Sequence, residues 1–443
     1  MRSYNKLNFK SDFKAINNSI QSALIIGGAG TIGSNYLKQL LALRPKNIVV
    51  VDINENGLTE LTRDLRSSDL LDYKPEYITY PVNLLSETFD KIFWSDNFDL
   101  IANFSAHKHV RSEKDKISVE ALIQNNVYGA IKLLELCSKR PPKYFFSVST
   151  DKAANPVNIM GASKSLMEKL ILSKQSEFRV STARFANVAF SNGSLLDGFL
   201  YRLNKKQPLS CPSDIKRFFV TPEQSGQICL LATFLGQSGN IFFPKLDFHK
   251  DQIYFKDIAL DFLKENGFEP LEVKSEEEAK TFDIKENPGK YPIYFFKTDT
   301  SGEKSYEEFY TEDEEYDINT YDSLGYIKTI EQPISFKNVK NDFDQVFDNP
   351  NSTKADIVSV INKYVPDFEH IETVNPTAPQ GGAIHIAAIG GFDNFNPYLL
   401  KGQPALGLKY LHDPLMRRVL EEPFSLYGLI AKQVIVPDDR SSI

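Results

Sequence analysis

Short apolar runs alternate with amphipathic stretches along the first part of the chain. Apolar runs with few polar interruptions are typical of strands buried on both faces of a parallel sheet, and apolar residues three or four positions apart are typical of helices. We therefore expect strands at 22–28, 47–52, 77–83, 99–106 and 143–150, with helices between them, for example at 31–43 and 57–68. The alternation predicts an α/β fold, a Rossmann doubly wound parallel sheet.

The pattern changes along the chain, which indicates several parts. We expect a polar lead-in at 1–20, the Rossmann domain at 21–190, a less regular part at 191–371, and a linker with a dissimilar fragment at 372–443. The third part holds two acidic runs, 275–280 and 306–317, which we expect to lie on a solvated surface. It ends in a helix that Ser352 or Thr353 is expected to cap.

Composition excludes several classes of protein. The net charge of −7, from 51 basic and 58 acidic residues, disfavours a broad nucleic-acid surface. Cys137, Cys211 and Cys229 form no closely spaced pair, which indicates neither a disulfide framework nor a metal site and favours a reducing, cytoplasmic compartment. The N-terminus is too polar for a signal peptide, and no apolar run approaches the roughly 20 residues that a membrane span needs.

A glycine-rich turn lies between the first strand and the first helix. Such a turn allows unusual dihedral angles and close backbone approach, and the helix start adds N–H groups for a pyrophosphate. Asp52 ends the next strand, where a carboxylate suits a ribose hydroxyl and favours NAD over NADP. Asn83 follows the third strand and either meets the adenine edge or is an ordinary turn asparagine. The turn residues expected to bind the dinucleotide are Gly27, Gly30, Thr31, Ile32 and Gly33.

The most informative segment follows the strand at 143–150. Thr150, Asp151 and Lys152 lie at the carboxyl end of this parallel strand, where ligands gather in open α/β sheets. Asp151 and Lys152 are either an acid–base pair or a surface pair that begins a loop.

Met160 and Lys164 are four residues apart and share a helix face. Their spacing resembles the tyrosine–lysine pair of short-chain dehydrogenases, with a methionine that cannot exchange protons in the tyrosine position. Lys164 is expected to bind the nicotinamide ribose; the alternative is a solvated helix lysine.

The segment STDKAANPVNIMGASK, residues 149–164, resembles the signature of UDP-N-acetylglucosamine 4,6-dehydratases of bacterial polysaccharide biosynthesis, in the branch with methionine. Four further segments resemble family segments in the same order: 105–111, with Arg111 where proline is usual, 125–130, 184–199 and 217–226. The part after residue 240 is most similar to the subgroup linked to legionaminic-acid-type sugars. The resemblance covers about 20–371 and implies an extended short-chain dehydrogenase/reductase.

The resemblance implies a reaction. Hydride leaves carbon 4 of the sugar, water is eliminated across carbons 5 and 6, and hydride returns to carbon 6, which gives a 4-keto-6-deoxy sugar without net oxidation. Thr150 would hold the 4-hydroxyl, Asp151 would protonate the departing hydroxyl, and Lys152 would be the base, with a depressed pKa. Met160 leaves open which group takes the 4-hydroxyl proton; Asp151 acting through water is one candidate.

The resemblance also assigns binding residues, and it makes residues 191–371 a substrate-binding part with a family-specific extension. Arg217 would clamp the UDP-sugar diphosphate, the alternative being a surface ion pair, and His109 is expected to be structural rather than catalytic. A homo-oligomer is expected. The remaining implied cofactor residues are Ser105, Ala106 and Lys108, and the implied substrate residues are Lys108, His109, Asn126, Thr150, Asn187 and Arg217.

Residues after about 380 resemble the early part of family 5 solute-binding proteins of peptide transporters. We interpret this fragment as a gene fusion, a reading-frame accident or an assembly chimera, without a function of its own. Three alternatives to the dehydratase remain: an NAD-dependent nucleotide-sugar epimerase or reductase, an idle NAD-binding module, and a peptide-binding transport component that the tail alone supports. The presence of all three residues of Thr150–Lys152 argues against an NAD-binding module without catalytic activity.

Overall fold

The computed structural model describes the chain up to residue 370 with short gaps. All of the described residues belong to one unit, Met1–Glu372. The predictions for Arg111 and for the C-terminal fragment lie outside the described residues. The described ranges are 5–16, 19–68, 73–110, 113–248, 250–284, 286–298 and 307–370.

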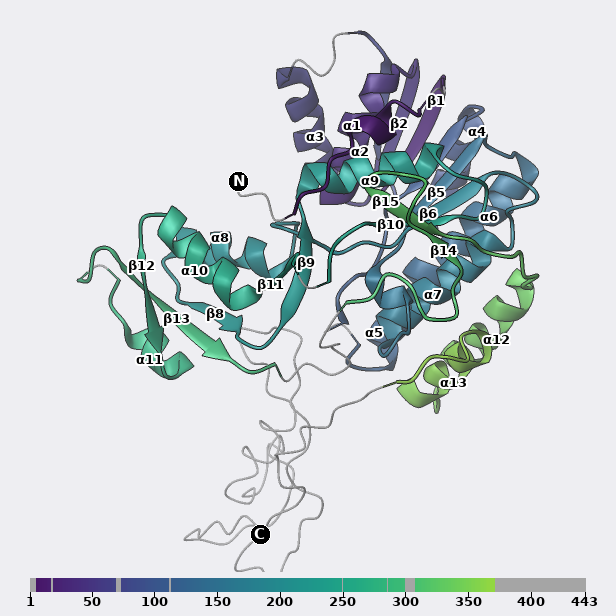
Figure 1. The fold of residues 1–443 in the computed structure, drawn as a ribbon. Coiled ribbons are helices and arrows are strands. Elements are labelled where there is room, and N and C mark those ends of the chain that lie inside the picture. The colour runs from purple at the N-terminus through teal and green to yellow at the C-terminus, as the bar shows by residue number, and fades with distance from the viewer. Residues whose placement is uncertain are drawn as a thin grey trace, which may run out of the picture. The chain divides into compact units, whose positions relative to one another are not determined.

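The main sheet has nine strands in the order β14-β15-β10-β6-β5-β4-β1-β2-β3 (Figure 1). Neighbours from β10 to β3 are parallel, and β15 and β14 add an antiparallel edge. The strand order reverses between β1 and β4, and ligands of doubly wound sheets bind at such a point. All five predicted strands are confirmed. The strands are β1 (Ser22–Ile26), β2 (Asn47–Asp52), β3 (Glu76–Pro81), β4 (Leu100–Asn103), β5 (Tyr144–Val148), β6 (Val180–Ala183), β10 (Ile241–Pro244), β14 (Tyr316–Asp317) and β15 (Leu324–Ile327).

Helices cover both faces of this sheet. Successive side chains of a strand point to opposite faces, so Leu24 and Ile26 of β1 join one core and Ala23 and Ile25 the other. The first core is closed by α4 (Glu87–Ser95), α5 (Lys116–Ile123), α6 (Gly129–Lys139), α7 (Ile159–Leu172), α12 (Phe336–Asp348) and α13 (Lys354–Tyr364). The second is closed by α2 (Thr31–Leu40), α3 (Glu55–Ser67) and α9 (Pro222–Phe234).

Short helical turns complete this part. The polar lead-in contains α1 (Lys10–Phe13), and a 3₁₀ turn, η1 (Leu41–Leu43), continues α2. A π-helical turn, η3 (Gln124–Tyr128), joins α5 to α6, and a 3₁₀ turn, η4 (Asp151–Ala153), follows β5. Thr353 is the N-cap of α13 and forms a capping box with Asp356, so of the two predicted caps Thr353 is confirmed.

A smaller part of the unit holds two three-stranded sheets, β11-β9-β7 and β12-β13-β8, and lies at the left of Figure 1. Its core joins α8 and α10 to β8 and β13. Between β9 and β11 the chain adds β10 to the main sheet, and after β13 it adds β14 and β15, so the main sheet draws on residues beyond 190. The elements are β7 (Asn187–Val188), β8 (Leu209–Pro212), β9 (Lys216–Val220), β11 (Gln252–Tyr254), β12 (Glu269–Val273), β13 (Lys290–Phe296), α8 (Leu195–Lys205), α10 (Phe255–Glu265) and α11 (Glu276–Thr281).

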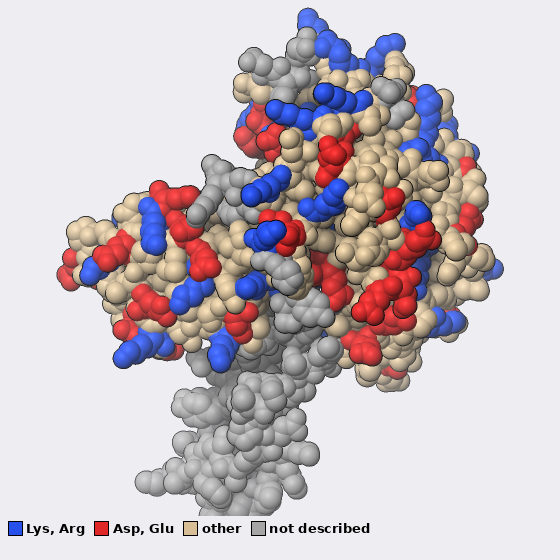
Figure 2. Space-filling model, in the orientation of Figure 1, with Lys and Arg blue, Asp and Glu red and all other residues tan. Residues whose placement is uncertain are grey.

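The surface carries both signs of charge. Figure 2 shows basic and acidic side chains interspersed over the face that it draws. Within the described part of the chain, no helix is both long enough and apolar enough to cross a membrane.

Candidate active site

The glycine-rich turn joins β1 to α2 and is too tightly packed for larger residues. Gly27 has a φ of +74°, and its amide donates to the carbonyl of Val51 at 2.7 Å. A Cβ on Gly33 would lie 2.3 Å from the carbonyl oxygen of Gly27. Gly30 is the N-cap residue of α2 and has no side chain to bond the first N–H groups of the helix. The turn is therefore a compact cradle with helix N–H groups at its edge, as a pyrophosphate requires.

The Asp52 carboxylate lies beside this turn. Its Oδ2 accepts a hydrogen bond from the Ala29 amide at 2.9 Å, and its Oδ1 accepts one from the Asn54 amide at 2.9 Å. Asn83 is exposed, and its side chain accepts a hydrogen bond from the amide of Leu85 at 2.8 Å, as a turn asparagine does. Its meeting with an adenine edge stays a prediction.

The backbone of Asn192 connects the glycine turn with the segment after β4. Its amide donates to Thr31 Oγ1 at 3.0 Å, and its carbonyl accepts from Lys108 Nζ at 2.8 Å. Ser105 lies on the same segment and donates from its hydroxyl to Asn103 Oδ1 at 2.7 Å. Desolvation, followed by the charges of Lys108 and His107, lowers the pKa of His109, which favours the neutral imidazole.

The central feature of the site is the turn η4 directly after β5. Thr150 is its N-cap, and Thr150 Oγ1 donates to Asp151 Oδ1 at 2.7 Å. Lys152 Nζ lies 3.1 Å from Asp151 Oδ2 and 3.2 Å from Oδ1. Asp151 is only 5% exposed, so the alternative of a surface pair at the start of a loop is wrong.

The predicted depressed pKa of Lys152 is wrong. Desolvation alone lowers the pKa of this amine, but the carboxylates of Asp151 and Glu307 raise it, and the net shift is upward. Lys152 therefore carries the proton of the pair in the resting protein. The sequence showed Asp151 but gave no sign that a second carboxylate lies near the amine.

Helix α7 brings Met160 and Lys164 against this turn. Both side chains are buried, and Lys164 Nζ donates to the carbonyl of Val148 at 2.8 Å. Burial lowers the pKa of Lys164 to about 8. A Cβ on Gly161 would lie 2.3 Å from the carbonyl oxygen of Lys152, so the missing side chain lets α7 approach the turn. The alternative of a solvated helix lysine is wrong.

Asn126 fixes the segment after β4 from the π-helical turn. Its Oδ1 accepts from the His107 amide at 2.9 Å, and its Nδ2 donates to the His107 carbonyl at 3.0 Å. Its Nδ2 also donates to Ser163 Oγ at 2.9 Å, which links this segment to α7. Asn126 thus has a bracing geometry in the structure.

The prediction that the acidic run 306–317 is solvated is wrong for Glu307, which is 3% exposed. Its Oε1 accepts from Asn187 Nδ2 at 2.5 Å, and its Oε2 accepts from the Phe218 amide at 2.6 Å. Arg217 Nε lies 3.8 Å from the same Oε1, and Arg217 is itself buried. The alternative of a surface ion pair for Arg217 is therefore wrong. A buried guanidinium and amide can hold a carboxylate inside the protein, which explains the burial of this residue.

A second buried charge network lies next to the turn η4 and was not predicted. Arg184 NH2 lies 2.7 Å from Glu168 Oε2, and Arg184 NH1 lies 2.8 Å from Glu314 Oε2. Ser149 Oγ donates to Glu168 Oε1 at 2.5 Å, so the network reaches the residue before Thr150. No spacing rule joins these residues, because they meet only in the folded chain.

Glu113 is another residue that the sequence did not single out. Its two carboxylate oxygens accept from the amides of Ile159 and Met160, at 2.9 and 2.6 Å. A carboxylate at a helix start is favoured by the helix dipole, so Glu113 fixes the beginning of α7.

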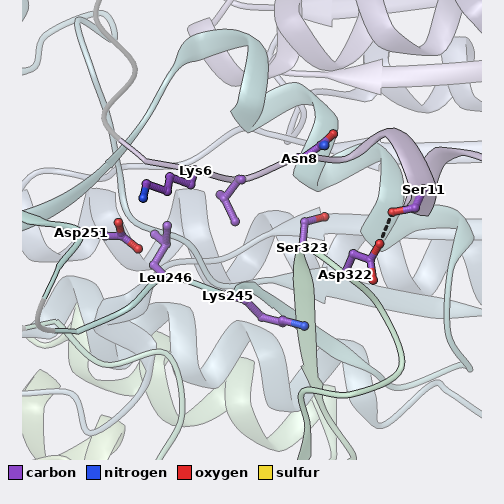
Figure 3. A pocket seen from close by; sticks show the side chains of 9 residues that line it. Lys6, Asn8, Ser11, Lys245, Leu246, Asp251, Asp322 and Ser323 are labelled. Atoms are coloured by element: carbon purple, nitrogen blue, oxygen red, sulfur yellow. Dashed lines mark hydrogen bonds between the residues drawn. The ribbon is translucent and has the colours of Figure 1, made fainter.

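A pocket of about 250 Å³ lies apart from these groups (Figure 3). None of its lining residues belongs to the glycine turn, to Thr150–Lys152 or to the Glu307 cluster. We therefore place the candidate active site by its chemistry and not by this pocket. The pocket is lined by Lys6, Leu7, Asn8, Ser11, Lys245, Leu246, Asp251, Asp322 and Ser323.

The sheet order, the glycine turn and the residues after β5 together define an extended short-chain dehydrogenase/reductase fold. This fold is similar to the X-ray structure of Pen from Bacillus thuringiensis, with a TM-score of 0.58 and 22% identity over 73% of this chain and 96% of that chain. The profile of the polysaccharide biosynthesis protein family matches residues 23–329. The chain belongs to this family.

Relatives share moderate identity with the chain. An uncharacterized membrane protein of Methanocaldococcus jannaschii is 28% identical over 310 residues, 69% of this chain and 84% of that protein. The UDP-N-acetylglucosamine 4,6-dehydratase (inverting) of Campylobacter jejuni is 27% identical over 238 residues, 51% of this chain and 67% of that protein. The chain spans less than half of two longer relatives, 44% of EpsC of Bacillus subtilis and 49% of CapD of Staphylococcus aureus.

The C-terminal part has a separate relative. It matches the probable peptide-binding protein YejA of Agrobacterium fabrum with 43% identity over 77 residues, 17% of this chain and 12% of that protein. The predicted likeness of this part to peptide-binding proteins is confirmed to that extent.

Proposed function

We propose that this chain is a nucleotide-sugar 4,6-dehydratase that acts on UDP-N-acetylglucosamine or a close nucleoside-diphosphate sugar. The observation that carries the proposal is the buried pair Asp151–Lys152 beside the Thr150 hydroxyl at the carboxyl end of β5. Elimination of water needs a group that gives a proton and a group that takes one, and this pair supplies both. The family and the Campylobacter jejuni relative support the same class of reaction.

The proposed cofactor is NAD. At Gly27 and Gly33 the cradle has no room for a side chain near the backbone, which suits close approach of a pyrophosphate. The Asp52 carboxylate beside the turn suits the two hydroxyls of a ribose and would repel a 2′-phosphate. NAD supplies a reversible acceptor for the hydride of carbon 4.

The proton chemistry follows from the resting charges of the pair. Lys152 carries the proton and Asp151 the negative charge. A sugar ring that excludes water from the pair would disfavour the two charges relative to a neutral pair. Transfer of one proton over the 3.1 Å from Lys152 Nζ to Asp151 Oδ2 then leaves an amine and a carboxylic acid.

The neutral pair would perform the elimination in one step. The amine of Lys152 takes the proton from carbon 5, and the carboxylic acid of Asp151 gives its proton to the departing hydroxyl of carbon 6. Water leaves, and the resting charges are restored. Thr150 orients the 4-hydroxyl. The proton of this hydroxyl passes through water to the bulk solvent, since Met160 cannot accept it and Asp151 already carries the proton of the neutral pair.

A mass measurement tests the proposal. The protein is incubated with NAD and UDP-N-acetylglucosamine, and the product is expected to be lighter by one water without net formation of NADH. An epimerase would give a product of unchanged mass, and a reductase would consume reduced cofactor. Absence of water loss from a panel of UDP-, GDP- and dTDP-sugars would overturn the proposal.

A further inference from the structure

Glu307 is a buried carboxylate that holds two residues expected to bind the substrate. It accepts a hydrogen bond from Asn187, and the guanidinium of Arg217 lies beside it. The side chains of Arg217 and Glu307 are 4% and 2% exposed, so little water screens their charges. The proposed clamp for a diphosphate therefore already faces a carboxyl group of the protein, which is an anion above about pH 8.

A diphosphate at Arg217 and an ionised Glu307 cannot both be close without repulsion. Like charges that share a buried site force one of them to take a proton. We propose that Glu307 is a proton-accepting positioning residue: when a nucleoside diphosphate engages Arg217, Glu307 releases this ion pair and takes up one proton. The inference rests on the proposed function, because it needs a diphosphate in the site.

The charges around Glu307 make this exchange feasible at mildly alkaline pH. Asp151 and Lys152 from η4 and Arg217 from β9 act on it, and Glu308 is its neighbour in the chain. Burial and then Asp151 raise the pKa of Glu307 to about 8, against the opposing effects of Lys152 and Arg217. A diphosphate would cancel the effect of Arg217 and raise this pKa further. A protonated carboxyl keeps acceptor capacity, so Asn187 and the Phe218 amide can stay bonded.

These pKa shifts determine the direction in which UDP binding depends on pH. Below about pH 7, Glu307 is already protonated in the free protein, so UDP binding should take up almost no protons from solution. Above pH 8, free Glu307 is mostly ionised, and binding should take up a proton. UDP affinity should accordingly fall as the pH rises above 8, by up to about tenfold per unit.

Calorimetry of UDP binding in buffers of different ionisation enthalpy tests the inference between pH 7 and 9.5. The diphosphate of UDP is fully ionised over most of this range, since the second phosphate pKa is about 6. We expect proton uptake by the wild type to rise from about zero toward one per UDP as the pH passes 8. Glu307→Gln should take up none and should bind UDP more tightly than the wild type at pH 9. The matched control Glu308→Gln should behave as the wild type.

Each result decides the inference. A wild type that binds UDP without proton uptake would overturn it, as would Glu307→Gln with unchanged uptake or weaker binding at pH 9. If Glu307→Gln does not fold, the wild-type pH dependence still decides. A lack of UDP binding also overturns it. The dehydratase proposal fails separately, by absence of water loss from nucleotide sugars.

Discussion

Lys152 Nζ and Asp151 Oδ2 lie 3.1 Å apart at the carboxyl end of β5, in a pair whose acidic member is buried. The pair can move one proton internally without taking one from solution. Its net charge stays the same in the transfer, and only the separation of charge changes. A buried pair with this property suits a reaction that both removes and donates a proton.

Substitution of Lys152 tests the role of the pair. Lys152→Met keeps the length of the side chain but cannot accept a proton, and we expect kcat to fall by about 10²–10⁴-fold. NAD binding, measured by calorimetry, should stay unchanged, since the proposed cofactor groups are elsewhere. The exposed residue Lys328, in the variant Lys328→Met, is the control for loss of a lysine. Full activity of Lys152→Met would remove Lys152 as the base.

Lys164 should make the free energy of unfolding depend on pH in the alkaline range. Its pKa is lowered by burial from 10.5 to about 8, so between these values the unfolded chain binds more protons than the folded one. Stability from this group is therefore present above pH 10.5 and is lost as the pH falls through 8.

The comparison of wild type with Lys164→Met isolates this effect. The difference in the free energy of unfolding, wild type minus variant, should rise by about 3 kcal/mol between pH 8 and 10.5. Urea denaturation at several pH values measures it. A difference in free energy that does not change over this range would show that burial does not lower the pKa of Lys164.

The network of Arg184 should matter more for stability than surface ion pairs do. Arg184→Leu leaves Glu168 buried without its cation, and we expect a loss of about 3–5 kcal/mol in the free energy of unfolding. The exposed pair Lys328–Glu315 provides the control, because Lys328→Ala should cost at most about 1 kcal/mol. Equal losses in the two variants would contradict the assignment.

Gly33 should be less replaceable than Gly30. A Cβ on Gly33 would lie 2.3 Å from the carbonyl oxygen of Gly27, so Gly33→Ala should cost about 1–3 kcal/mol and weaken NAD binding more than tenfold. A Cβ on Gly30 would be 3.4 Å from the same atom, and Gly30→Ala should change stability by less than about 1 kcal/mol. Urea unfolding measures the stability of the two variants, and calorimetry measures their NAD binding. A larger effect of Gly30→Ala than of Gly33→Ala would contradict this prediction.

The sequence predicted what depends on local pattern. The strands around Gly27, the helix at Lys164 and the turn at Thr150 follow from periodicity and from glycine positions, and the structure confirms these elements. Alternation of side chains along β1 also explains why both sheet faces are covered.

The sequence did not predict the features that depend on contacts between residues far apart in the chain. Glu307 looked like part of a solvated acidic run, yet Asn187 and Arg217 hold it in the interior. Asp151 raises the pKa of Lys152 most, and Glu307 raises it further from a segment more than a hundred residues away in the sequence. Charge runs indicate composition, but only the fold shows which member is buried.

The most direct test of the central claim follows one hydrogen through the reaction. UDP-N-acetylglucosamine that carries deuterium at carbon 4 is incubated with the protein and NAD, and the product is examined by mass spectrometry and proton NMR. The account predicts a product that has lost one water and carries the deuterium at carbon 6. A product with unchanged mass and deuterium at carbon 4 would contradict it and favour an epimerase.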